Sequence, residues 1–153
     1  MNWFRFRHGV LTVALLCAGV LSLGCKVDTS NPYYNTGPTP TALADTYSGT
    51  LDNSGDVPVL RLTHTLTTTN AGTMSITLTN NTPDPALTLG MGIGAWDTTT
   101  STCGQLLAYN NSAVVGSLII GNAIAGSFCV QVYDVGKLAA GAQTSYTITV
   151  THY

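Results

Sequence analysis

The sequence predicts an all-β fold, in the form of a single antiparallel β-sandwich of about eight strands. Only 8% of the 153 residues are charged, and all seven acidic residues are Asp, with no Glu anywhere. Helices usually draw on Glu, Lys and Arg, whereas abundant Thr, with Val, Ile and Tyr, favours half-buried pleated surfaces. Short apolar runs alternate with turn residues through most of the chain, which is typical of sandwiches and barrels. The length allows one domain after a processed leader.

Residues 1–24 have the pattern of a secretory signal peptide. Arg5 and Arg7 precede an apolar run from Val10 to Leu23, and Lys26 follows the run closely. A transmembrane helix needs about 20 apolar residues, so this run is short for a retained span. We therefore expect an exported protein.

The end of this run resembles the lipobox of bacterial lipoproteins, in which a small residue precedes a lipidated cysteine. Here Gly24 precedes Cys25, and the segment reads Leu21-Ser22-Leu23-Gly24-Cys25. Lipoproteins usually have Leu three residues before the cysteine, where this chain has Ser22. The resemblance implies that Cys25 carries the lipid and holds the protein on a cell-envelope membrane, at the outer membrane or periplasmic face. The alternative is an incidental thiol. Stable anchoring needs more than one acyl chain, which a lipoprotein cysteine would supply.

Residues 25–43 predict an extended tether between the lipidated N-terminus and a domain at 44–153. The segment from Lys26 to Leu43 holds three prolines and shows no apolar periodicity. From residue 25 onward the chain has three basic residues, Lys26, Arg61 and Lys137, and seven Asp. Its net charge is therefore 3 − 7 = −4. An acidic chain without a basic stripe argues against nucleic acid as a partner.

The remaining cysteines, Cys103 and Cys129, predict one disulfide. One cysteine of the four falls in the leader and Cys25 takes the lipid, so a single pair is left in an exported chain. A structural zinc site would need about four ligands, and only His64 and His152 are available in the domain to complete one. We expect no such site.

In the predicted strands, apolar residues alternate with Thr and Ser. We expect the apolar residues to face the core and the Thr and Ser residues to face solvent. The inward lines are legible in several strands, as in Met74, Ile76 and Leu78 or in Tyr146, Ile148 and Val150. The eight predicted ranges are Thr46 to Leu51, Val57 to Leu66, Thr73 to Asn80, Ala86 to Ala95, Gln105 to Tyr109, Gly116 to Ala123, Phe128 to Val135 and Thr144 to His152.

The stretch LGMGIGAWD places Gly90, Gly92 and Gly94 at alternate positions of a predicted strand that leads to Trp96. A nucleotide-binding loop needs a glycine turn that opens a helix, and no helical pattern follows here. Glycine inside a strand usually means that something approaches the backbone closely. That could be a large cross-strand side chain, or a ligand in a groove beside Trp96.

A resemblance to bacterial pre-peptidase C-terminal domains covers about Asp45 to His152. It lies in the order of short strand motifs, and it implies a jelly-roll β-sandwich in a family whose related domains bind collagen or calcium. The chain departs from the family pattern in two respects: the acidic residues directly before the fourth strand are reduced to Asp84, between Pro83 and Pro85, and no Glu exists to chelate calcium. The matching motifs are Thr46 to Leu51, Ala71 to Leu78, Ala86 to Leu89, Gly126 to Tyr133 and Ser145 to Val150.

If every strand reverses direction, alternate connections gather at the two ends of the sandwich. Cys103 and Cys129 then share the end that carries the tether, which supports the disulfide. The opposite end collects the oxygen-bearing side chains of Asp52, Asp56, Asp84, Asn110 and Asp134. Calcium takes six to eight oxygen ligands, so this end could hold it. Turns also use Asp and Asn for conformational reasons alone.

The function that these features indicate is non-catalytic. His64 interrupts an apolar line, as a partly buried, hydrogen-bonded strand residue would, His152 ends the last strand, and no nucleophile elbow accompanies either. We expect a lipid-anchored envelope protein that displays its sandwich for surface structure or binding, without a cofactor other than an optional calcium ion. The alternative is a specific module for carbohydrate or matrix protein, with Trp96, Tyr109 or the glycine face as its platform.

Overall fold

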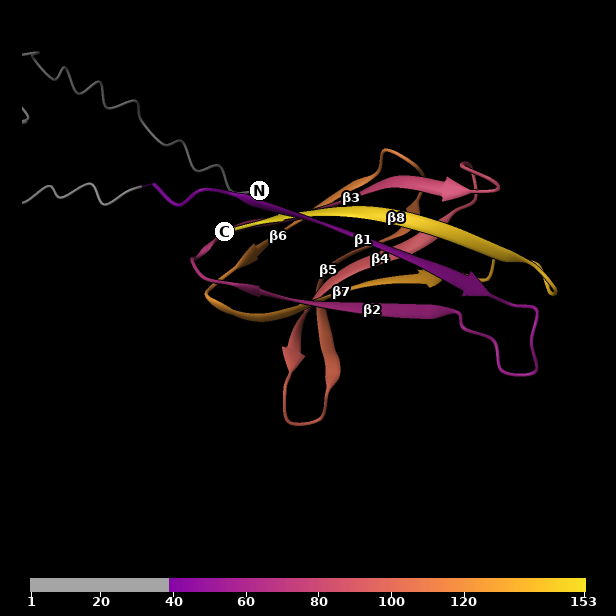
Figure 1. Cartoon of the computed structure of the whole chain (residues 1–153), viewed down its shortest axis with the longest axis horizontal. Coiled ribbons are helices and arrows are strands. Elements are labelled where there is room, and N and C mark those ends of the chain that lie inside the picture. Colours follow the sequence, from indigo (N-terminus) through magenta and orange to yellow (C-terminus); the bar gives the residue numbers. More distant parts are fainter. Residues whose placement is uncertain (1–38) are drawn as a thin grey trace, which may run out of the picture. The chain divides into compact units, whose positions relative to one another are not determined.

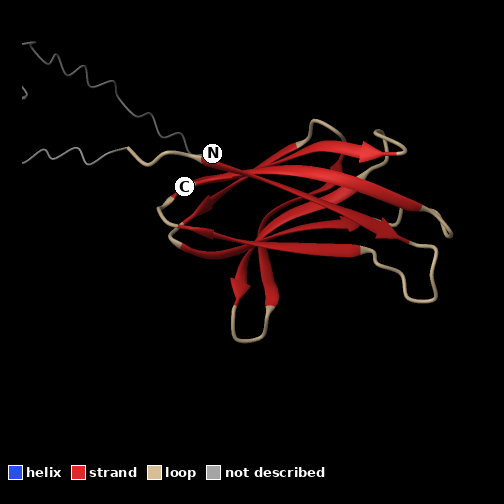
Figure 2. Cartoon of the chain, in the orientation of Figure 1, coloured by secondary structure: helices blue, strands red, loops and turns tan. Residues whose placement is uncertain are grey.

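The computed structural model describes residues 39–153, so the leader, Cys25 and most of the tether lie outside the described residues. The described part consists of strands joined by short loops (Figures 1 and 2). No helix within residues 39–153 is long and apolar enough to cross a membrane. The strands are β1 (Leu43–Asp52), β2 (Arg61–Thr68), β3 (Gly72–Thr82), β4 (Leu89–Asp97), β5 (Thr102–Ala113), β6 (Leu118–Ala123), β7 (Gly126–Asp134) and β8 (Gln143–His152).

The strands form two four-stranded sheets in the orders β1-β8-β3-β6 and β2-β7-β4-β5. Every neighbouring pair is antiparallel. The first strand pairs with the eighth, the second with the seventh, the third with the sixth and the fourth with the fifth, which is the winding of a jelly roll. The predicted fold class is therefore confirmed.

The core lies between the sheets and is built from the apolar lines that alternation predicts. Met74, Ile76 and Leu78 on β3 have no exposed surface, and Ile148 and Val150 on β8 also have none. Burying an aliphatic side chain of this size contributes about 1.5–3 kcal/mol. Leu60 and Leu87 are half-buried at the margin of the core.

The outer face of the first sheet is covered by hydroxyl side chains. Ser48 on β1 faces Thr147 on β8 at 3.0 Å, and Thr50 faces Ser145 at 2.8 Å. Cross-strand hydroxyl pairs of this kind support one register of the two strands over its alternatives. The Thr and Ser lines seen in the sequence are thus the solvated face of this sheet.

Two strand boundaries differ from the sequence prediction in ways that matter for the site. Strand β2 begins at Arg61, not at Val57, because Pro58 cannot donate to a ladder and Val59 forms only an isolated bridge with Asp52. Strand β5 continues to Ala113, where it pairs with Leu89. The Asn pair at 110–111, predicted to form a loop, is therefore inside a strand.

Candidate functional site

The predicted disulfide between Cys103 and Cys129 is confirmed. It joins β5 to β7 and passes over β4, the strand that lies between them in the sheet β2-β7-β4-β5. Cys103 lies in β5 and Cys129 in β7, with β4 between them, and their Cα atoms are 5.7 Å apart. Strands on either side of a shared neighbour lie about 9–10 Å apart in a flat sheet. The pairing of β4 with β5 shifts register on both sides of Gly94, and this irregularity accompanies the close approach of the two cysteines.

Gly94 is the residue over which this disulfide passes. A Cβ atom at Gly94 would lie 3.0 Å from the sulfur of Cys103 and 3.2 Å from that of Cys129. A side chain here would press on a covalent bridge that is held at both ends. The glycine is therefore required by the packing of the disulfide.

The other two glycines of β4 are also covered by side chains. The ring of Tyr133 lies over Gly90, and the end of the Leu106 side chain lies over Gly92. All three glycines are buried. The glycine face is thus occupied by cross-strand side chains, which is the first of the two alternatives that the sequence left open, and it is not free to serve as a binding platform. The spacing of the glycines located the strand face without side chains. It could not identify the residues that cover this face, because they belong to β5 and β7, which are other strands of the sheet.

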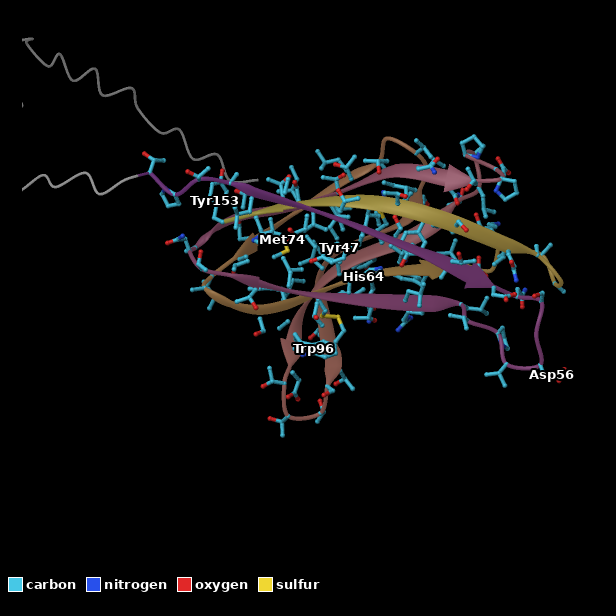
Figure 3. The ribbon with its side chains drawn as sticks, viewed as in Figure 1. Tyr47, Asp56, His64, Met74, Trp96 and Tyr153 are labelled. Carbon is cyan, nitrogen blue, oxygen red and sulfur yellow. A yellow bond between two sulfur atoms is a disulfide. The ribbon has the colours of Figure 1, made fainter. Side chains whose placement is uncertain are left out.

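Trp96 lies at the end of this face, where it is half-buried beside a groove of about 250 Å³. Figure 3 shows Trp96 at the base of the hairpin that β4 and β5 form, close to the disulfide. Trp96 on β4 and Cys103 on β5 are cross-strand partners, so one cysteine of the disulfide lies directly opposite Trp96. The residues lining the groove are Thr65, Leu66, Thr67, Trp96, Thr98 and Ser127.

The groove arises because β4 leaves β7 before the hairpin turns. The last pair between these strands is Ala95 with Phe128, and beyond it the hairpin projects from the sandwich (Figure 1). The opposite wall is a pair of hydroxyl residues, Thr67 on β2 and Ser127 on β7. The groove is therefore bounded by three strands of one sheet.

Asp97 fixes the turn of the hairpin that carries Trp96. Hydrogen bonds from the Thr100 hydroxyl and from the backbone N–H groups of Thr99 and Thr100 hold the pKa of Asp97 below its usual value. The backbone bond from Thr99 to the carboxylate is 2.8 Å. The carboxylate thus serves the turn, while the groove itself is lined by uncharged residues.

This combination of groups suits a neutral, polyhydroxylated ligand. An indole presents a large apolar face, and Ser and Thr hydroxyls each donate one hydrogen bond and accept two. Sites of this class hold a ligand through an apolar surface and a few directed polar groups. A charged ligand would find no countercharge among the lining residues.

Four of the five residues predicted to form a calcium-binding end accept hydrogen bonds from backbone N–H groups two to four residues away in the sequence. Hydrogen bonds from the Ser54 hydroxyl and from the Ser54 N–H, the latter at 2.7 Å, lower the pKa of Asp52. Asp84 accepts a hydrogen bond from the Ala86 N–H at 2.9 Å. Local caps of this type are the conformational role that Asp has in turns. The remaining pairs are Asp134 with the Lys137 N–H and Asn110 with the Ser112 N–H, both at 2.8 Å.

Some of the predicted loops do meet at one end. The Gln143 side chain donates to Asp52 at 2.7 Å, and the Asn53 side chain donates to the Leu138 carbonyl at 2.9 Å. Asp56 lies in the exposed β1–β2 loop (Figure 3). Within residues 39–153 no three His, Cys, Asp or Glu side chains are grouped to hold a metal ion. Asn110 departs most from the prediction, because it is in strand β5 opposite Met91.

The two histidines of the domain are inward-facing strand residues. His64 stacks on Tyr47 with ring centroids 4.9 Å apart, and its Nε2 is 2.8 Å from the hydroxyl of Tyr146. Burial lowers the pKa of His64 and raises the pKa of Tyr146 to about 12. His152 is buried, with Nε2 3.0 Å from a carboxylate oxygen of Asp45. His64 is thus a half-buried, hydrogen-bonded residue, as the sequence predicted.

Comparisons with known proteins give one similar fold. No family model matches the chain. No curated protein matches it either. The pre-peptidase C-terminal domain of a collagenase from Bacillus anthracis, solved at 1.0 Å, is similar with a TM-score of 0.49 and 18% identity over 71% of this chain and 89% of that chain. At this similarity neither family membership nor a shared function follows.

Proposed function

We propose that this protein is a non-catalytic, exported lipoprotein that displays its sandwich on a cell-envelope membrane for binding. The apolar leader that ends at Gly24-Cys25 supports export and lipidation. The disulfide between Cys103 and Cys129 is consistent with that proposal, because such bonds persist in oxidising compartments. The lipid on Cys25 holds the protein on the membrane surface.

The Trp96 groove carries the proposal that the bound ligand is a neutral carbohydrate. It combines an indole, five uncharged neighbours and a volume of about 250 Å³ in one place on the sheet surface. This observation favours specific recognition over a purely structural display. The site requires no metal ion, since its lining offers hydroxyl groups and no carboxylate.

Membrane fractionation of cells that produce the full chain tests the anchor. We expect Cys25→Ala to release the protein from the membrane fraction, because one residue carries all the acyl chains. Cys17→Ala is the matched control, since it removes a thiol from the leader without touching the lipidation site. If the Cys25→Ala protein remains wholly in the membrane fraction, the proposed anchor is wrong.

Glycan-array binding by the full chain tests the recognition proposal. Truncating a central aromatic residue of a binding site typically costs at least 2 kcal/mol, so Trp96→Ala should weaken binding by about 30-fold or more. Tyr109→Ala is the aromatic control, because Tyr109 is 63% exposed and lies outside the groove. EDTA should leave binding unchanged. Binding to matrix protein alone, or equal loss in both variants, would refute a carbohydrate site at Trp96.

A further inference from the structure

One segment of the chain has no charge and supplies most of the large apolar side chains that are exposed within the described residues. From Thr98 to Tyr133 the chain has no Asp, Glu, Lys, Arg or His. This segment includes β5 and β6, which lie at the ends of their two sheets. Seven of the ten large apolar side chains that are exposed within the described residues belong to it: Leu107, Tyr109, Val114, Val115, Leu118, Ile120 and Ile124.

Strand β6 is the unprotected edge among the four strands that end the two sheets. Proteins usually guard such edges with charged side chains, proline or bulges, because unpaired N–H and C=O groups attract other strands. Strand β1 carries Asp45 and Asp52, and β2 carries Arg61. Strand β5 has three register shifts against β4.

Strand β6 has none of these protections. Its sequence, LIIGNA, contains no charge and no proline, and its six pairs with β3 run without a bulge. Leu118 and Ile120 point outward and are 53% and 59% exposed. Alternate residues of β6 direct their backbone N–H and C=O groups away from β3, where no strand of the described part pairs with them.

We propose that β6 pairs with β6 of a second copy of this chain, in antiparallel orientation about a twofold axis. An antiparallel strand pair is self-complementary, as an isologous contact requires. The pairing would extend the sheet β1-β8-β3-β6 into one sheet of eight strands and place Leu118 and Ile120 of both copies on the same face. In this pairing the free backbone N–H and C=O groups of β6 would form hydrogen bonds, and the exposed apolar side chains of the two copies would contact each other.

The charge distribution favours a second copy of this chain as the partner of β6. The described residues carry six Asp against Arg61 and Lys137, and none of these charges lies on β5 or β6. Two copies of an acidic protein repel each other wherever their carboxylates meet. The β5–β6 side is the surface on which two copies can meet without bringing these charges together. A membrane surface would instead favour a basic patch, which this side lacks.

Sedimentation equilibrium of the full chain in density-matched detergent tests the dimer. We expect a dimer, and we expect Ile120→Asp to raise its dissociation constant by about 5-fold or more, because like charges of the two copies would face each other across the new strand pair. Val57→Asp is the control, since Val57 is 85% exposed in the β1–β2 loop. It adds the same charge away from β6 and should leave the dimer intact.

Two further measurements keep the test independent of folding. Ile120→Lys and Ile120→Asp should each self-associate more weakly than the unaltered protein, and an equal mixture of the two should associate more tightly than either variant alone. In the unaltered protein the outward-facing amide protons of β6 should exchange slowly, and in Ile120→Asp they should exchange rapidly while those of β3 stay protected. The proposal is overturned by a monomer at every concentration, by a dimer that Ile120→Asp leaves unchanged, or by slow exchange at β6 in a monomer, which would mean that another part of the chain covers the edge.

Discussion

Gly90 lies directly beneath the ring of Tyr133, whose hydroxyl donates a hydrogen bond to Asn111 at 2.6 Å. We expect Gly90→Ala to lower the free energy of unfolding by about 1–3 kcal/mol, because the new methyl group overlaps the ring and forces it away from Asn111. Chemical denaturation measures the change. Gly55→Ala is the control, since a Cβ there meets nothing closer than 3.9 Å. Equal stability of the two variants would show that Tyr133 does not cover Gly90.

His64 gives the folded protein a dependence on pH that can be isolated. An unfolded histidine titrates near pH 6.5, and burial lowers the pKa of His64 in the fold. Below about pH 6.5 the unfolded chain therefore binds more protons than the folded chain, so this contribution to stability is present above that pH and is lost as the pH falls. The neighbouring ionisable groups are Tyr47 and Tyr146, which stay protonated in this range.

Thermal unfolding at pH 7.5 and pH 5.0 checks this effect. The unaltered protein should lose more stability between the two pH values than His64→Gln, which keeps a polar side chain without the titrating ring. His152 and Asp45 are present in both proteins, so the difference between the two profiles belongs to His64. Identical profiles would contradict the effect of burial on the pKa of His64.

At the level of single residues, the sequence predicted which side chains face the core and not which side chains meet. Alternation identified Met74, Ile76 and Leu78 correctly, because a strand has a fixed period of two. It could not pair Tyr133 with Gly90 or Leu106 with Gly92, since those contacts depend on strand order and on the irregular register of β4 with β5. The same limit hid the stacking of His64 on Tyr47.

The β4–β5 hairpin and the disulfide at its base act as one element. The cysteines are 26 residues apart, and closing a loop of that length stabilises the fold by about 3.5 kcal/mol on the chain-entropy model. We expect the double variant Cys103→Ala/Cys129→Ala to lose about this much stability and also to bind ligand more weakly, because Cys103 is paired with Trp96. Denaturation and glycan binding, measured on the same samples, check both effects.

A control separates general destabilisation from loosening of the hairpin. Gly90→Ala is expected to destabilise the same sheet while leaving the disulfide and Trp96 in place. If both proteins bind ligand equally well at a temperature where both are folded, the disulfide does not position Trp96. Unaltered stability in the double variant would contradict the loop-closure contribution.

At the level of elements, all eight strands were predictable because short alternating runs and turn residues mark them. The start of β2 and the end of β5 were harder to predict from the sequence. Pro58 ended the ladder where apolar residues continued, and the two Asn residues at 110–111 have low strand propensity although β5 runs through them to Ala113. The groove beside Trp96 depended on where β4 separates from β7, which no local pattern encodes.

For the whole molecule, the jelly-roll winding explains how residues far apart in the sequence line one groove. Thr65 and Thr67 from β2, Ser127 from β7 and Trp96 from β4 meet because these three strands are neighbours in one sheet. The predicted calcium end shows the opposite outcome. The winding brings several of its loops together, yet Asp84 and Asp134 accept hydrogen bonds within their own loops, and Asp52 accepts them from Ser54 and Gln143.

The fluorescence of Trp96 tests the central claim, that the groove binds neutral carbohydrate. Trp3 and Trp96 are the two tryptophans of the chain, and Trp3 lies in the predicted leader, so Trp3→Phe keeps the groove residue the single reporter even where the leader is retained. Titration of this full-chain variant with neutral oligosaccharides should give a saturable change in emission and protect Trp96 from acrylamide quenching. Emission and quenching that remain unchanged with every neutral oligosaccharide, in a protein that still unfolds cooperatively, would contradict the claim.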